Sequence, residues 1–239
     1  SGDTLVLRAA QLSFDLAVER ISGSGGFYLA AGDLVLTARA GGFDFATEKA
    51  EFVGEVEFAQ GKPGPGGMSR IYADSMELDL SEGGEVESVN LPAGLEGTIR
   101  TGGPGASWIK ASAGSILLSR EKLSRLQLDG DADVTYRNTD TGSVSRFQGR
   151  SMSLNFDERG TLVQVTAEGG ATVVSRLPEG SRDEPSAGDT ATPGQTSAAA
   201  ALQTDDQAGR AEATMNTVRG ERLEILLYGG EVVEVRGIE

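Results

Sequence analysis

One pattern recurs six times in this chain and constrains its fold more than any other feature. Each copy begins with a large apolar residue, has a small residue two positions later, and ends in apolar residues at alternate positions. The copies are residues 7–16, 36–45, 71–80, 109–118, 147–156 and 218–227. Only an extended chain sends alternate side chains to one face, so this period of two predicts β-strands.

The order of apolar and small residues within each copy predicts a bend. The first apolar residue and the later ones lie on opposite parities, which requires a bulge or a corner between them. The small residues near this point are Ala9, Ala38, Ala73, Ala111, Gly149 and Gly220. Each copy is therefore predicted to be a strand that turns a corner along its length.

A second arm follows a turn in several copies. It is clearest in residues 123–136 and 162–174, and it recurs less regularly in residues 49–58 and 232–237. Gly54, Gly130, Gly169 and Gly237 lie near its middle or end, where a strand bends or another backbone comes close. The chain is therefore predicted to be all-β and built from stacked, repeated hairpin arms.

The spacing of the copies also predicts the domain organisation. Residues 178–210 are rich in Pro, Ser, Thr, Ala, Gly and acidic residues, and Leu202 is their only large aliphatic residue. Such a segment buries too little apolar surface to offset the entropy of ordering, so we predict a disordered insertion. Residues 1–177 then hold the first five repeat units, and residues 211–239 form a final hairpin that completes the same domain.

Composition excludes several classes of function. The chain has no Cys and no His, so thiol chemistry is absent, as are the commonest general base and the commonest metal ligand. Its net charge of −15 opposes binding to nucleic acid and to anionic bilayer surfaces. No motif for catalysis or for a cofactor is present. We therefore expect a protein that is not an enzyme and that has no cofactor.

Two local features suggest a functional site, but each has a simpler structural explanation. The segment DGDAD, Asp129–Asp133, suggests calcium, but an EF-hand loop needs Gly where Val134 stands, so no metal site is expected. The sole Trp108 is interpreted as a packing residue at a boundary between units. With few aromatic platforms for sugars, a carbohydrate-active enzyme is the weakest hypothesis.

Basic residues recur near the start of the arms and leave two interpretations open. They are Arg8, Arg39, Lys110, Arg150 and Arg219. They either contact phosphates of a ligand or pair with acidic residues on neighbouring strands. Cross-strand pairing is the favoured interpretation, because acidic residues are abundant around them.

Together the arms resemble the OstA-like family of lipopolysaccharide transport proteins, which includes the LptA and LptC types. The segments that carry the resemblance are AAQLSFD, ARAGGFD with FVGEVEF, ADSMELD, GRSMSLNFDERGTLVQVTAEGGATV and GERLEILLYGGEVVEVRG. The resemblance implies an open β-jelly roll, a "β-taco", in the periplasm. No targeting or anchor segment is recognised in this chain, and composition leaves two alternatives open, a soluble cytoplasmic protein or one whose targeting segment has been removed.

The resemblance also implies a function and partners. Family members shield the acyl chains of lipopolysaccharide on the way to the outer membrane and line up end to end. The expected partners are lipopolysaccharide or a related lipid, other OstA-like proteins bound through strand edges, and further copies of this chain. Nucleic acid is not expected as a partner.

The alternating apolar residues are the candidate lining of a lipid groove. They are Leu12, Phe14, Phe43, Phe45, Met76, Leu78, Ile116, Leu118, Met152, Leu154, Phe156, Leu223 and Ile225. An alternative is a structural or adhesive β-repeat protein in which the same side chains form a closed core with no lipid. Both architectures need one apolar face, so the pattern does not separate them.

Overall fold

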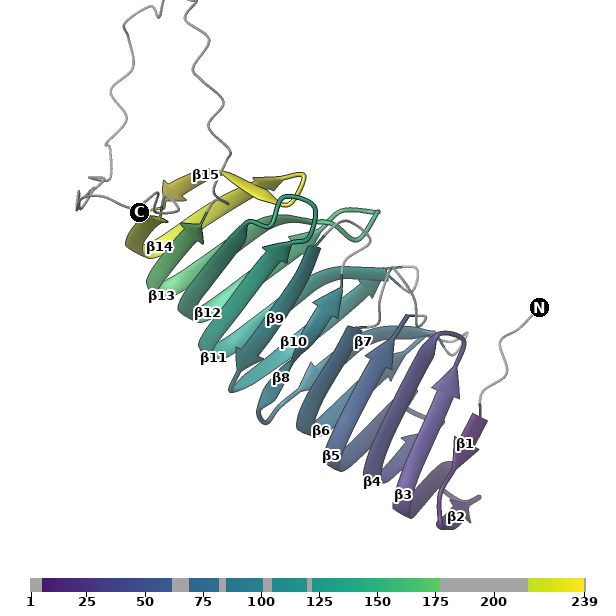
Figure 1. Cartoon of the computed structure of the whole chain (residues 1–239). Helices are drawn as coiled ribbons and strands as arrows, with labels where there is room; N and C mark the ends of the chain where they lie inside the picture. The colour runs from purple at the N-terminus through teal and green to yellow at the C-terminus, as the bar shows by residue number, and fades with distance from the viewer. Residues whose placement is uncertain are drawn as a thin grey trace, which may run out of the picture.

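The computed structural model describes residues 6–61, 69–81, 85–100, 105–119, 122–176 and 215–238. These residues form one sheet of fifteen strands in which every pairing is antiparallel, and the strands follow one another like steps (Figure 1). The predicted segment 178–210 lies outside the described residues. Within the described ranges, no helix is long and apolar enough to cross a membrane.

The strands are β1 (Val6–Arg8), β2 (Gln11–Asp15), β3 (Arg20–Ala31), β4 (Leu34–Asp44), β5 (Lys49–Gln60), β6 (Ser69–Leu80), β7 (Val86–Leu91), β8 (Leu95–Arg100), β9 (Gly105–Ala111), β10 (Ala113–Ser119), β11 (Lys122–Asn138), β12 (Val144–Phe156), β13 (Leu162–Arg176), β14 (Met215–Tyr228) and β15 (Glu231–Gly237).

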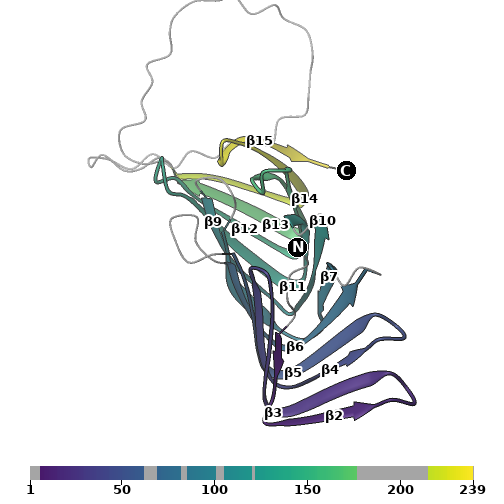
Figure 2. The ribbon, with the colours of Figure 1, turned by 90° about the vertical axis from the view of Figure 1, so that its right-hand side faces the viewer.

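The sheet is folded along a corner into two walls, which Figure 2 shows in profile as a V. Wall A contains the short strands β1, β8 and β9, and wall B contains β2, β7, β10 and β15. Each of the long strands crosses the corner and contributes one half to each wall. The predicted open β-jelly roll is therefore confirmed.

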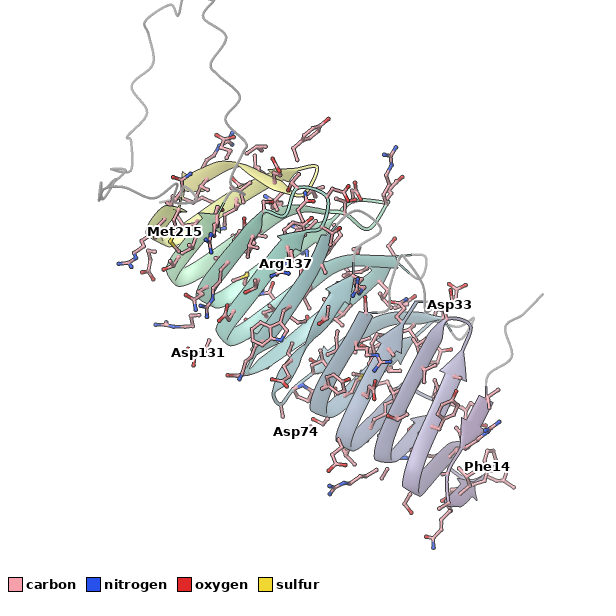
Figure 3. The ribbon with its side chains drawn as sticks, viewed as in Figure 1. Phe14, Asp33, Asp74, Asp131, Arg137 and Met215 are labelled. Carbon is pink, nitrogen blue, oxygen red and sulfur yellow. The ribbon has the colours of Figure 1, made fainter. Side chains whose placement is uncertain are left out.

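Bulges make the corner, as the change of parity within each copy predicts. The strand register shifts between Val53 and Val56 in β5, between Asp129 and Ala132 in β11, and between Glu168 and Ala171 in β13. In these bulges Gly54, Gly130 and Gly169 take φ angles of 78°, 73° and 76°, which residues with a Cβ rarely adopt. Figure 3 marks the corner at Asp74 and Asp131.

The middle of the chain differs from the prediction. The copy at residues 109–118 forms two strands, β9 and β10, with Ser112 between them. The N–H of Ser112 donates to the carbonyls of Asp129 and Gly130 at 3.1 and 2.8 Å, and this interrupts the regular pairing of the strand. Strands β7 and β8 were not predicted. Pro92 follows β7. In the pairing of β6 with β7, a register shift between Asp79 and Leu80 disturbs the alternation of β7.

Two apolar rows run across the strands on the inner face of the V. Members of a row lie directly opposite one another from strand to strand. The wall A row is Leu7, Leu29, Leu36, Phe58, Ile71, Gly97, Ile109, Val134, Phe147, Val173 and Val218. The wall B row is Phe14, Ile21, Phe43, Ala50, Leu78, Val89, Ile116, Leu126, Leu154, Val165, Ile225 and Val235.

These rows hold the strand register. A slip by one residue would move a whole strand's apolar set to the outer face. Full burial of one Leu, Ile or Phe side chain stabilises the fold by about 1.5–3 kcal/mol, so a slipped strand would lose several such contributions. The period of two in the sequence therefore specifies both the strands and their alignment.

The outer face of wall B carries a row of alternating charges. Asp15, Arg20, Asp44, Lys49 and Asp79 lie opposite one another in that order. Asp79 Oδ2 accepts a hydrogen bond from the Ser88 hydroxyl at 2.6 Å, and Asp79 Oδ1 lies 3.1 Å from Lys49 Nζ. The Ser88 hydrogen bond, with a further contribution from Lys49, lowers the pKa of Asp79 below its ordinary value.

This network predicts an effect on acid stability. A carboxyl whose pKa is lowered by folding stabilises the protein above the unfolded value near pH ~3.9, and this contribution is lost as pH falls through the folded-state pKa. Ser88→Ala should therefore raise the pKa of Asp79 and move acid unfolding to a slightly higher pH. An NMR titration of the carboxyl measures the shift. Ser13→Ala, on the same outer face, is the control, and an equal shift in both variants contradicts the assignment.

Candidate functional site

The thirteen predicted lining residues all lie on the inner face of wall B or at its rim, but their surroundings differ. Nine are buried in the apolar core: Met76, Leu78, Ile116, Leu118, Met152, Leu154, Phe156, Leu223 and Ile225. Phe43 is half-buried. Leu12, Phe14 and Phe45 are exposed. The structure thus separates the predicted set into a filled part and an open part.

The filled part extends from β6 through the C-terminal half of the V, and the buried apolar cluster to which it belongs begins at Phe27 in β3. Leu154 of wall B and Phe147 of wall A are each 0% exposed, and both belong to one continuous apolar cluster. Side chains of the two walls pack against each other there, as in the core of a sandwich. This half has the closed-core architecture that the sequence left as an alternative.

The open part lies at the opposite end of the V and is called here the N-terminal mouth. It is an exposed apolar group made of Leu12, Phe14, Leu16, Val18 and Phe45. Phe14 and Phe45 are 56% and 46% exposed, and their ring centroids are 6.3 Å apart. Phe45 also contacts Phe43 edge-on at 4.5 Å, which joins the mouth to the wall B row. Figure 3 shows Phe14 at this end of the molecule.

At the C-terminal end the rims of the two walls meet. The turn between β14 and β15 is at the rim of wall B, and the end of β11 is at the rim of wall A. Asn138 Nδ2 donates to the carbonyl of Gly229 at 2.9 Å across this gap, and Gly230 is buried against the Tyr136 hydroxyl. A direct contact therefore closes the V here, whereas apolar side chains stay exposed at the N-terminal mouth.

Beside the closure, wall A carries a row of hydroxyl groups on its inner face. Ser107, Tyr136, Ser145 and Ser175 lie opposite one another on β9, β11, β12 and β13. The hydroxyls of Ser145 and Ser175 share a hydrogen bond of 3.0 Å. Ser107 and Tyr136 are 0% and 1% exposed, and no residue in the described ranges supplies a partner for either hydroxyl.

Burial, with a further contribution from the charge of Asp140, raises the pKa of the Tyr136 hydroxyl above 10.0. The group is therefore neutral at physiological pH and retains its proton as a donor. The sequence pattern did not predict the hydroxyl row. The row is formed by strand pairing between residues far apart in the chain, so no local pattern marks it.

The acidic segment at the corner has a structural role. Asp131 lies in the bulge of β11, and Asp133 pairs with Arg146 and accepts a hydrogen bond from Gln148 Nε2 at 3.3 Å. No group of three or more His, Cys, Asp or Glu residues in the described part of the chain is arranged to hold a metal ion.

Among the recurring basic residues, Arg39 pairs with Glu55, and Arg8 lies over the Tyr28 ring at 5.9 Å.

Trp108, interpreted from the sequence as a packing residue at a unit boundary, lies on the outer face of the sheet. Its neighbours Ser107 and Ile109 face inward, and the alternation of the strand therefore directs Trp108 to the outer face. There it lies opposite Thr98 and Thr135 and is 41% exposed.

Comparisons with known proteins add a similarity in structure but none in sequence. No family model matches the sequence, and no curated protein matches it. The crystal structure of LptH, the LptA-homologous periplasmic component of the lipopolysaccharide transport device of Pseudomonas aeruginosa, matches with a TM-score of 0.43 and 16% identity, over 57% of this chain and 82% of that chain. A similarity at this level carries no argument about family or function.

Proposed function

We propose that this protein is a periplasmic lipid-binding bridge protein that shields the acyl chains of lipopolysaccharide, or of a related lipid, during transport to the outer membrane. The observation that carries the proposal is the N-terminal mouth. Its exposed Phe14 and Phe45 continue directly into the buried apolar row of wall B. The resemblance of the repeated arms to the OstA-like family supports the choice of lipid and compartment.

Physical chemistry favours binding through the tails of the lipid. Each methylene removed from water contributes ~0.8 kcal/mol, so part of one acyl chain laid on the mouth gives substantial affinity. The net charge of −15 opposes the phosphates of a lipid headgroup. The headgroup therefore stays outside the V while the chains lie on the apolar surface. This function needs neither catalysis nor a cofactor.

Strand edges are the proposed contacts with partners. Within the described residues, β2 pairs only with β3, and β15 pairs only with β14. Their free backbone donors and acceptors are able to extend the sheet into a neighbouring molecule. The proposed neighbours are other OstA-like proteins or further copies of this chain placed end to end.

Photo-crosslinking tests the lipid at the mouth. A photoreactive amino acid at Phe14 should give crosslinks to lipid in cells that make lipopolysaccharide, because this side chain is exposed on the inner face. Leu117 is the matched control, since it is 50% exposed on the outer face of the same wall. Crosslinks to lipid from both positions, or to protein alone from Phe14, would contradict the proposal.

The filled C-terminal half favours a second candidate, a structural β-repeat protein without a lipid ligand. Phe14→Asp separates the two functions, because this exposed residue is not needed for the core. Under the lipid-binding proposal, the variant keeps its unfolding temperature, and native mass spectrometry shows at least a several-fold loss of copurified lipid. The structural candidate is supported if the wild-type protein carries no lipid.

A further inference from the structure

The inner face of wall A changes from apolar to polar one step before its rim. On β9, β11 and β12, the apolar row residues Ile109, Val134 and Phe147 are each two positions from a hydroxyl residue of the next row. That next row is Ser107, Tyr136, Ser145 and Ser175, called here the hydroxyl row. An apolar surface bordered by aligned hydroxyls matches an amphiphile, in which a hydrocarbon chain joins a polar group.

Two glycines enclose the Tyr136 hydroxyl. A Cβ atom on Gly105 would lie 2.1 Å from this oxygen, and one on Gly230 would lie 2.2 Å from it. Only residues without a side chain leave room for the hydroxyl at these two positions. The hydroxyl itself has no partner among the described residues, nor does that of Ser107 beside it.

Unpaired hydroxyls are unfavourable inside a protein. A buried polar group without a hydrogen bond costs about 1–3 kcal/mol, so two adjacent ones point to a partner that the described residues do not supply. Phe in place of Tyr136, or Ala in place of Ser107, would avoid this cost with little change in shape. The two hydroxyls therefore have a use outside the packing of the core.

We propose that the hydroxyl row is a subsite for the polar group of an acylated ligand, namely a hydroxyl, ester or amide next to the hydrocarbon chain. This inference rests on the proposed function. When the turn at Gly229 and Gly230 opens, the chain of the ligand inserts beside the apolar row, and Ser107 and Tyr136 hydrogen-bond its polar group. The ligand class is thereby narrowed from any hydrocarbon to acyl chains that carry a hydrogen-bonding group.

The turn at Gly229 and Gly230 is the lid of this subsite. It covers the Tyr136 hydroxyl, and the hydrogen bond from Asn138 to the carbonyl of Gly229 links it to wall A. A ligand reaches the hydroxyl row only when this contact opens. Asn138→Ala removes the hydrogen bond, and it should speed the association of a hydroxylated ligand about fivefold in stopped-flow measurements. An unchanged association rate would contradict the assignment of this turn as a lid.

Two matched fatty acids test the subsite on the full-length protein. The probes are tetradecanoic acid and β-hydroxytetradecanoic acid, which differ by one hydroxyl, and titration calorimetry gives their Kd values. The wild-type protein should bind the hydroxylated acid about tenfold more tightly, the effect of one or two net hydrogen bonds. Tyr136→Phe should reduce this ratio to about one, and Ser107→Ala should reduce it in part. Tyr228→Phe, at an exposed tyrosine, should leave it unchanged.

The outcomes separate the inference from the proposed function. If the wild-type protein binds neither acid, both fail. If it binds both acids equally, or if Tyr136→Phe keeps the tenfold ratio, the subsite is overturned while lipid binding stands. Thermal unfolding of Tyr136→Phe controls for folding. Since the lost hydroxyl has no partner in the described chain, its unfolding temperature should stay the same or rise.

Discussion

Leu154→Asp is expected to prevent folding. Leu154 is fully buried in the wall B row, between Leu126 and Val165 on the neighbouring strands. A carboxylate there would be desolvated without a partner, which costs about 5 kcal/mol or more, comparable with the whole free energy of unfolding of many domains. Circular dichroism and urea unfolding of the purified variant measure the loss.

Two control variants isolate the cause. Leu154→Met keeps the apolar volume and should cost less than about 1.5 kcal/mol. Leu117→Asp places the same charge on the outer face, opposite Arg125, and should cost no more than about 1 kcal/mol. A folded Leu154→Asp protein that only loses lipid would show that the C-terminal half is an open groove and not a core.

Gly97→Ala is expected to have the next largest effect. Gly97 takes a position in the wall A row, opposite Ile71 and Ile109, where every other member has a side chain. A Cβ atom at Gly97 would lie 2.2 Å from the carbonyl oxygen of Arg70 and 2.8 Å from Cα of Ile71. Because both atoms are backbone, strand β6 would have to move. We expect a loss of about 3 kcal/mol and a fall in Tm of about 10 °C.

Gly237→Ala is the matched control for this prediction. Gly237 also lies in a strand, but a Cβ atom there would have no heavy atom within 4 Å. The substitution should change Tm by no more than a degree or two. If differential scanning calorimetry gives the two variants equal Tm values, the close approach of β6 and β8 is wrong.

The alternation of apolar residues was sufficient to predict the strands and their inward faces. Met76 and Leu78 fall on the predicted face because period two admits no other arrangement once one side of a strand is buried. The corner was also predictable, since a change of parity within a strand requires a bulge. Strand β7 was missed because a bulge interrupts its alternation, and β8 because Gly97 takes the middle one of its inward positions and leaves only two large apolar residues, Leu95 and Ile99.

Whether the apolar faces form a core or a groove depended on which strands and side chains surround them in the folded sheet. Leu154 and Phe14 belong to copies of the same repeat and to the same row, yet one is buried and the other is 56% exposed. Leu154 is on β12, which lies between β11 and β13, whereas Phe14 is on β2, which pairs only with β3 among the described strands. Asn138 and Gly229, 91 positions apart in the chain, also meet across the end of the V away from β2. Local periodicity therefore specifies which face of each strand is apolar. What that face touches is decided by the neighbouring strands and by contacts between distant rims, which no repeat encodes.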